Sequence, residues 1–133
     1  MKYFLDTNIV SYILKKDPVA ESKLRELFAD ENNEFCIPIV TYYELKRGLL
    51  ATNATKKIQM LERILETRFK VVMMDFAMYE KSAEIYAALK SKGEIIEDDD
   101  IFIGATALCS CATLITNNGK HLSRIDGLSV LSW

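Results

Sequence analysis

The chain has 133 residues, half of them hydrophobic and 27% of them charged, and its formal net charge is −2. This composition predicts one domain with a packed core, and it excludes collagen-like, disordered and strongly polycationic chains. The single histidine excludes a ribonuclease with a two-histidine acid and base, and it also excludes a histidine-rich zinc site.

Cysteine content and the N-terminal sequence indicate the compartment. Three cysteines, an odd number, favour reduced thiols, and Asp6 interrupts the first apolar run too early for a secretory signal. No uncharged apolar run is long enough to span a bilayer. We therefore expect a cytoplasmic protein without a membrane partner.

Short apolar runs and helical segments alternate from the beginning of the chain. A β-prone run at residues 2–5 is followed by Asp6-Thr7-Asn8, whose side chains can cap a helix. Asp17-Pro18 is the start signal of a second helix. A strand is predicted over residues 34–39, where Pro38 favours a strand end or an edge position.

The middle of the chain continues this alternation. Thr41 is expected to cap a helix that carries Glu44 and ends near Gly48. Apolar residues at helical spacing predict the next helix over residues 58–69, and the apolar run at 71–74 predicts a short strand.

The last third begins with a long helix that ends at Gly93. One face of this helix holds Phe76, Tyr79, Ala83, Tyr86 and Lys90. Residues 101–111 are apolar nearly all round, which predicts a helix buried on most sides. Strands are expected at residues 113–116 and 128–131, with a turn at Asn117-Asn118-Gly119.

The alternation predicts an α/β fold in which helices cover both faces of a mainly parallel, five-stranded sheet. In such folds, ligands bind at the carboxyl ends of the strands, near the point where the strand order reverses. The residues that directly follow the strands are therefore the candidates for chemistry.

Carboxylates and amides follow several of the predicted strands. Asp6 follows the first strand, Glu44 lies about one helical turn after the second, and Asn118 follows the fourth. The run Asp98–Asp100 precedes the buried helix. Gathered at one edge, these acids would repel one another and favour a bound cation, and all-oxygen ligands select Mg²⁺ or Mn²⁺ over zinc. Such a metal could activate water and stabilise a phosphoryl transition state.

Each of these residues also has an ordinary structural explanation. Asp6 could be only a helix cap, Glu44 could only favour the helix dipole, and Asn118 could be a turn residue. The acids at 98–100 could mark a helix start, and His121 could be structural or could support the site from outside it. Taken together, the four positions favour a site more than any one of them does alone.

Charge is unevenly distributed along the chain. Residues 46–70 contain the bases Lys46, Arg47, Lys56, Lys57, Arg63, Arg68 and Lys70 against Glu62 and Glu66. Residues 94–100 contain five acids and no base. A basic face beside an acidic site could hold a polyanion over bound metal, but charge alone favours ordinary solvated helix faces.

Four motifs occur in order along the chain. They are Leu5-Asp6-Thr7-Asn8; Thr41-Tyr42-Tyr43-Glu44-Leu45 with Gly48; Asp98 to Ala105 after Gly93; and Thr116-Asn117-Asn118 with Leu122. Together with Gly127-Leu128 and Trp133, they resemble the motifs of PIN-domain proteins, and most closely those of the toxin subunits of VapBC-type toxin–antitoxin modules. The resemblance covers essentially the whole chain.

The resemblance implies a single PIN-like domain, residues 1–133, folded as a three-layer α/β/α sandwich with Mg²⁺- or Mn²⁺-dependent endoribonuclease activity. It implies that Asp6, Glu44 and an acid of the third motif hold the metal. The spacing points to Asp100, with Asp98 as an alternative or additional ligand. The family often has an Asp at the position of Asn118 and a second acid at that of His121, so this chain has less negative charge there for a second metal ion.

The resemblance also implies an RNA substrate, products with a 5′-phosphate and a 3′-hydroxyl, and a small antitoxin that keeps the nuclease inactive. Lys46, Arg47, Lys56 and Lys57 are the candidates for contacts to the RNA backbone. An arginine of the antitoxin could occupy the carboxylate cluster in place of the metal, because a guanidinium pairs with carboxylates through two hydrogen bonds.

A homodimer is predicted from the apolar segment that contains Tyr42, Tyr43, Leu49 and Leu50, and the resemblance points the same way. The alternative function is a non-catalytic RNA- or protein-binding module, against which the three retained carboxylate positions argue. A receiver-type phosphorylation domain would need paired acids after the first strand, and these are absent, although Asp75 follows a predicted strand.

Overall fold

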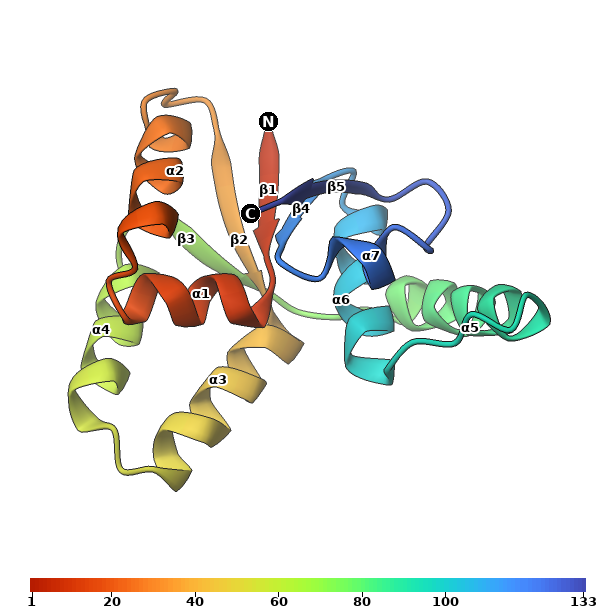
Figure 1. Cartoon of the computed structure of the whole chain (residues 1–133), viewed down its shortest axis with the longest axis horizontal. Coiled ribbons are helices and arrows are strands. Elements are labelled where there is room, and N and C mark those ends of the chain that lie inside the picture. Colours follow the sequence, from red (N-terminus) through yellow and green to blue (C-terminus); the bar gives the residue numbers. More distant parts are fainter.

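Five parallel strands form one sheet in the order β3-β2-β1-β4-β5 (Figure 1). The computed structural model describes residues 1–133. The strands are β1 (Lys2–Leu5), β2 (Glu34–Pro38), β3 (Phe69–Val72), β4 (Thr113–Thr116) and β5 (Ser129–Ser132). The helices are α1 (Thr7–Leu14), α2 (Pro18–Phe28), α3 (Ile39–Ala51), α4 (Thr55–Leu65), α5 (Phe76–Ser91), α6 (Asp98–Cys109) and α7 (Gly119–Leu122).

The strand order reverses at β1, because β2 lies on one side of this central strand and β4 on the other. Phe4 of β1 is in register with Cys36 of β2 and with Leu114 of β4. Helices cover both faces of the sheet, which confirms the predicted three-layer α/β/α architecture (Figure 1). The carboxyl ends of β1, β2 and β4 therefore meet at one edge.

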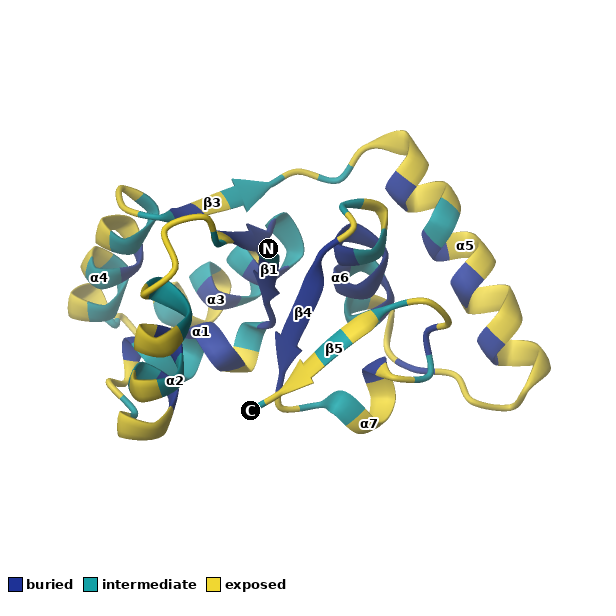
Figure 2. Cartoon of the chain, turned by 90° about the horizontal axis from the view of Figure 1, so that it is seen from above, coloured by how far each residue is buried: buried dark blue, intermediate teal, exposed yellow.

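Alternate side chains of β1 enter two separate cores. Phe4 packs with Cys36 and Leu114 in the core beneath α5 and α6. Tyr3 and Leu5 face the opposite side, where α1 to α4 cover the sheet. Because β1 and β4 are covered on both faces, they are buried at successive positions rather than at alternate ones, as Figure 2 shows.

Several element boundaries differ from the predicted ones. The helix predicted over residues 58–69 is α4, which runs from Thr55 to Leu65, and α3 continues past Gly48 to Ala51. β3 begins at Phe69 rather than at residue 71, because Phe69 is buried in register with Phe35 of β2. α3 begins at Ile39, directly after the strand, so Thr41 is buried inside the helix and does not cap it. Pro38 occupies the N-cap, where a residue without an N–H costs the helix nothing. Glu44 consequently lies in the second turn.

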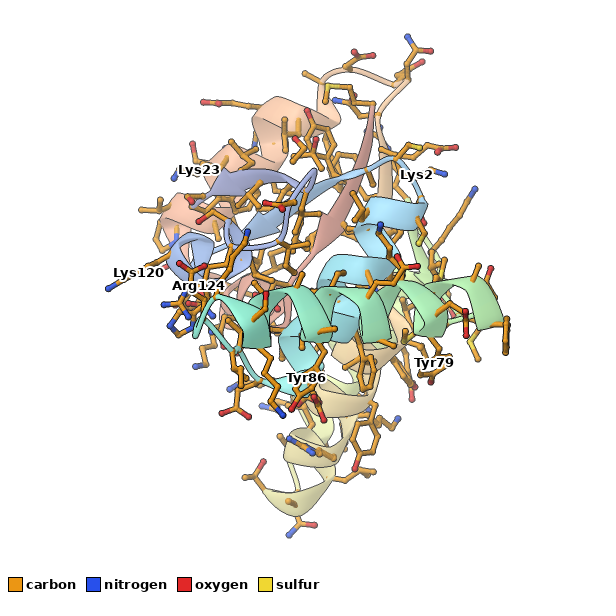
Figure 3. The ribbon with its side chains drawn as sticks, turned by 90° about the vertical axis from the view of Figure 1, so that its right-hand side faces the viewer. Lys2, Lys23, Tyr79, Tyr86, Lys120 and Arg124 are labelled. Carbon is orange, nitrogen blue, oxygen red and sulfur yellow. The ribbon has the colours of Figure 1, made fainter.

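The aromatic face predicted for α5 points away from the core. Tyr79 and Tyr86 project from the same side of this helix (Figure 3), and Phe76 is 80% exposed. The buried residues of the helix are instead Met78, Ser82, Ile85 and Leu89. Both sets have helical spacing, so the sequence pattern alone does not identify which face of α5 is buried.

Arg68 is part of the fold rather than of a basic surface. Its guanidinium donates hydrogen bonds of 2.7, 3.0 and 2.9 Å to the backbone carbonyls of Phe28, Asp30 and Asn33, respectively. It also lies over the rings of Phe28 and Phe35, 4.7 and 5.2 Å from their centroids. One side chain therefore fixes the connection between α2 and β2 to the beginning of β3.

Replacing Arg68 by Ala should lower the free energy of unfolding by about 2 kcal/mol, because several carbonyls lose a charged donor and two rings lose their cation. Urea denaturation followed by circular dichroism measures this change. Arg63→Ala removes an exposed arginine side chain of α4 that makes no hydrogen bond or ion pair, and it should cost less than about 0.5 kcal/mol. Equal effects of the two substitutions would contradict the role of Arg68.

Candidate active site

Four elements bring polar side chains to the carboxyl edge of the sheet. Asp6 directly follows β1, Glu44 projects from α3 after β2, and Asn118 follows β4. Asp100 comes from the first turn of α6. The site lies where the strand order reverses, which is the position predicted from the alternation of strands and helices.

Asp6 is the most buried carboxylate of this group. One of its oxygens, Oδ1, accepts a 2.7 Å hydrogen bond from the Thr7 N–H, so Asp6 also caps α1. The other oxygen, Oδ2, accepts a 2.6 Å hydrogen bond from the Thr116 hydroxyl. Both oxygens are thus oriented by residues that belong to the fold.

Glu44 is held by the same segment that holds Asp6. Its Oε1 accepts a 2.7 Å hydrogen bond from the Thr7 hydroxyl, and Arg47 lies 4.0 Å from its other oxygen. Burial raises the pKa of Glu44, the hydrogen bond from Thr7 opposes this rise, and the neighbouring Asp99 adds to it. This carboxylate therefore lies in a partly dry, negatively charged environment.

Asp100 is the carboxylate with the largest shift. Burial, followed by the nearby charge of Asp6, raises the pKa of Asp100 to about 6, while His121 opposes the shift. The side-chain amide of Asn118 donates a 3.3 Å hydrogen bond to its Oδ2. A proton or a cation near Asp100 is favoured for the same physical reason, namely that its negative charge is poorly solvated.

A chain of hydrogen bonds joins the three carboxylates. Thr7 links Glu44 to Asp6, and Thr116 links Asp6 to the Asn118 N–H, which donates to its hydroxyl at 2.9 Å. Asn118 then reaches Asp100. Thr7 and Thr116 were not predicted as positioning residues, although Thr7 is adjacent to Asp6 and Thr116 ends β4. We name the carboxylates Asp6, Glu44 and Asp100, together with Thr7, Thr116 and Asn118, the carboxylate chain.

The structure does not bring Asp98 to the other carboxylates. Asp98 begins α6, and residues two positions apart on a helix point in different directions, so Asp98 and Asp100 cannot share one face. Asp98 is exposed and lines a cavity with Tyr79 and Phe102. Asp99, which was not singled out as a candidate ligand, is the residue of this run that lies near Glu44.

The donor set suits a hard divalent cation. Asp6, Glu44 and Asp100 offer only oxygen atoms, and two of them have raised pKa values because negative charges are gathered in partial burial. In this conformation, no three histidine, cysteine or acidic side chains converge closely enough to form a complete metal-binding group. Mutual repulsion of the carboxylates opposes closer approach, and a cation would remove that repulsion.

Comparison with known proteins assigns the family. A model described as the PIN domain matches residues 3–128. The chain belongs to the PIN domain family. Among curated relatives, "Ribonuclease VapC2" of Rickettsia felis is 32% identical, and the match covers 100% of this chain and 98% of the relative. The "tRNA(fMet)-specific endonuclease VapC" of Shigella flexneri is 30% identical, with the same coverage of both chains.

Solved structures share the fold of this PIN domain. VapBC2 from Rickettsia felis, bound to a DNA fragment from the promoter, matches with a TM-score of 0.90 and 29% identity. That match covers 100% of this chain and 99% of the other. VapBC-1 from nontypeable Haemophilus influenzae matches with a TM-score of 0.87 and 30% identity, covering 100% and 98% of the two chains. None of the helices of this PIN domain is long and apolar enough to cross a membrane.

The raised pKa of Asp100 predicts how stability depends on pH in the presence of EDTA. The folded domain binds the Asp100 proton more tightly than the unfolded chain does, so protonation of Asp100 stabilises the fold. This contribution to the free energy of unfolding is complete below pH 3.8 and is lost as pH rises through about 6. Asp100→Asn should therefore be more stable than the wild type at pH 7. The expected difference is about 1–2 kcal/mol, after allowance for the partial exposure of the side chain.

Urea denaturation at pH 4.5 and at pH 7 measures this difference, which should be smaller at pH 4.5. Asp126→Asn is the matched control, because Asp126 is exposed and pairs only with Lys92 at 3.6 Å. If Asp100→Asn and the wild type had equal free energies of unfolding at both pH values, the environment assigned to Asp100 would be refuted.

Proposed function

We propose that this PIN domain is a ribonuclease toxin, an endonuclease that hydrolyses RNA phosphodiester bonds and is neutralised by a cognate antitoxin. The observation that carries the proposal is the carboxylate chain, which gathers Asp6, Glu44 and Asp100 where the strand order reverses. Relatives named ribonuclease and endonuclease, matched over 98% of their length, support it.

We propose Mg²⁺ or Mn²⁺ as the cofactor, held by Asp6, Glu44 and Asp100. A divalent cation there would supply Lewis acidity, which lowers the pKa of water and neutralises charge that develops on the phosphate. Asp98 would join these ligands only if the first turn of α6 rearranged, so its predicted role depends on such a change.

The residues of the carboxylate chain would contribute to the reaction in three ways. Thr7 and Thr116 hold the two oxygens of Asp6 and one of Glu44, so these carboxylates need little reorganisation when substrate binds. Asn118 restrains Asp100, and its amide is a neutral donor at a position where a second carboxylate would repel a phosphate. The acidic site itself repels RNA unless a cation is bound, which makes activity depend on metal.

Two protein partners are also proposed. The antitoxin would place an arginine against the carboxylates in competition with the metal, and the similarity to VapBC complexes supports such a partner. A homodimer remains a prediction. Tyr43 and Leu50 of its proposed interface are exposed, whereas Tyr42 and Leu49 pack against the core beneath α1 to α4.

Light scattering of the purified domain at micromolar concentration tests the homodimer. If Tyr43 and Leu50 form the contact, Tyr43→Ser with Leu50→Ser should convert the dimer to a monomer without lowering the melting temperature, because both side chains are exposed. A wild-type protein that is already monomeric would contradict the prediction.

Cleavage of a mixed RNA sample tests the function and its metal dependence. The wild type should cut RNA with added Mg²⁺ or Mn²⁺ and should stop in EDTA, and mapped ends should carry 5′-phosphates. Asp6→Asn, Glu44→Gln and Asp100→Asn should each slow cleavage by at least about 100-fold, because each removes a proposed ligand. Circular dichroism checks that every variant is folded.

Asp126→Asn carries the same change of charge far from the carboxylate chain and should cut at the wild-type rate. Asp98→Asn decides whether Asp98 is a ligand, and we expect it to retain activity. A folded wild type that binds RNA without cutting it under any metal condition would favour the non-catalytic binding module instead.

A further inference from the structure

A groove lined by lysines opens directly from the candidate active site. A cavity of about 250 Å³ is lined by Thr7 and Glu44 of the carboxylate chain, and also by Lys15 after α1 and Lys57 of α4. A second cavity, of about 530 Å³, is lined by Lys16, Lys56 and Arg63. Consecutive residues line the two cavities at two points, because Lys15 and Lys57 belong to the first cavity and Lys16 and Lys56 to the second. We name these five bases the basic track.

The five bases of the track make no ion pair within the molecule. The ion pairs of the structure use other bases, among them Lys46, which pairs with Glu62 at 3.8 Å, and Arg47, which lies 4.0 Å from Glu44. The bases predicted from the sequence to contact the RNA backbone are Lys46, Arg47, Lys56 and Lys57. Of these, the structure leaves only Lys56 and Lys57 free to bind a polyanion.

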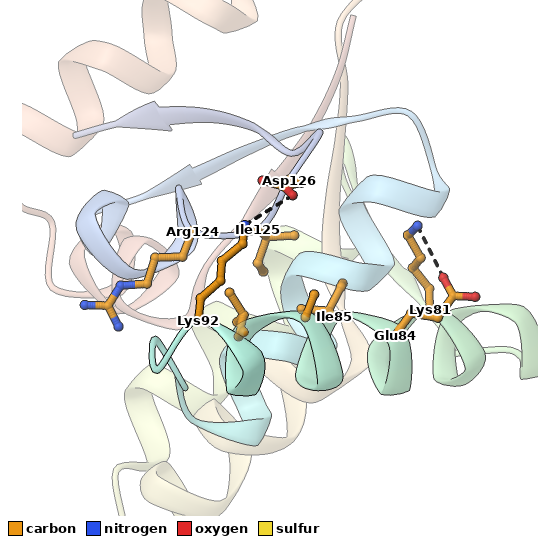
Figure 4. A pocket seen from close by; sticks show the side chains of 9 residues that line it. Lys81, Glu84, Ile85, Lys92, Arg124, Ile125 and Asp126 are labelled. Atoms are coloured by element: carbon orange, nitrogen blue, oxygen red, sulfur yellow. Dashed lines mark ion pairs between the residues drawn. The ribbon is translucent and has the colours of Figure 1, made fainter.

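The opposite side of the carboxylate chain has the opposite charge. A cavity there is lined by Glu97, Asp98 and Asp99, together with His121 and Tyr86. Lys81 on α5 and Lys92 directly after this helix are paired with Glu84 and Asp126 at 3.5 and 3.6 Å, respectively (Figure 4). A polyanion that enters the site is therefore attracted from the side of α1 and α4 and repelled from the side of α6.

We propose that single-stranded RNA binds with its phosphate backbone along the basic track, with the Lys15 and Lys57 end nearest the scissile phosphate. This proposal rests on the proposed function, because it takes RNA as the polyanion. Unpaired lysines can replace the counterions of the phosphates without first breaking protein ion pairs, and the release of those counterions drives binding. Met60 and Ile64, which line the outer cavity, offer apolar surface to unstacked bases.

Binding at several salt concentrations tests the track independently of cleavage. The probe is a fluorescein-labelled 20-nucleotide RNA of random sequence, measured by fluorescence anisotropy in EDTA. In the double variants Lys15→Gln/Lys57→Gln and Lys16→Gln/Lys56→Gln, the slope of log Kd against log salt should fall by about 0.7 for each phosphate that the variant no longer neutralises. Affinity should drop about tenfold near 0.1 M salt.

Lys70→Gln/Lys90→Gln is the matched control, because both lysines are exposed, form no ion pair and lie on β3 and α5, away from the track. This variant should keep the slope of the wild type. If the salt dependence of Kd had the same slope in the wild type, both track variants and the control, the proposal would be overturned. The groove would then be a candidate binding surface for a protein partner.

The length of the RNA separates the two ends of the track. This comparison uses Ca²⁺ in place of EDTA, because a bound cation removes the repulsion between the RNA and the carboxylates. A six-nucleotide RNA should respond to Lys15→Gln/Lys57→Gln but not to Lys16→Gln/Lys56→Gln, whereas the 20-nucleotide RNA should respond to both. If the six-nucleotide RNA responded to Lys16→Gln/Lys56→Gln but not to Lys15→Gln/Lys57→Gln, the proposed direction would be overturned. If the wild type binds RNA with these slopes but never cuts it, the track stands and the proposed nuclease activity fails.

Discussion

The placement of a buried carboxylate at the end of the central strand is the constraint on which the rest of the site depends. Asp6 cannot be surrounded by water, so its oxygens need donors from the protein, and Thr7 and Thr116 supply them at 2.7 and 2.6 Å. The same two threonines also bind Glu44 and the Asn118 backbone. Satisfying one charge thereby fixes the neighbouring residues that face it.

This arrangement leaves negative charge that hydrogen bonds do not remove. The hydrogen bond from Thr7 lowers the pKa of Glu44 and so partly offsets burial, but the neighbouring Asp99 raises this pKa again. Asp100 has only an amide donor at 3.3 Å and the more distant charge of His121. The folded domain therefore stores electrostatic repulsion at a position where a cation, whether a metal ion or a guanidinium, relieves it. The cost in stability and the capacity to bind a cation have one physical cause.

The distribution of charge around the site gives it a direction. Unpaired lysines lie on the side of α1 and α4, while acids lie on the side of α6, so an approaching polyanion meets attraction on one side and repulsion on the other. Net charge conceals this asymmetry, because the two sides nearly cancel in the total of −2. Ion pairs, which depend on the fold, decide which bases remain available.

The sequence by itself determined the parallel α/β/α fold and the candidates Asp6, Glu44 and Asn118, because hydrophobic periodicity and positions after strands are local properties of the chain. Asp100 was chosen from the run 98–100 through the resemblance to PIN-domain motifs, which left Asp98 as an alternative or additional ligand. Only the tertiary structure decided that Asp98 points elsewhere, that Thr7 and Thr116 orient the carboxylates, and that Arg68 is a structural residue. It also decided which face of α5 is buried. Those outcomes depend on the direction of side chains and on partners far away along the chain, and periodicity carries no information about either.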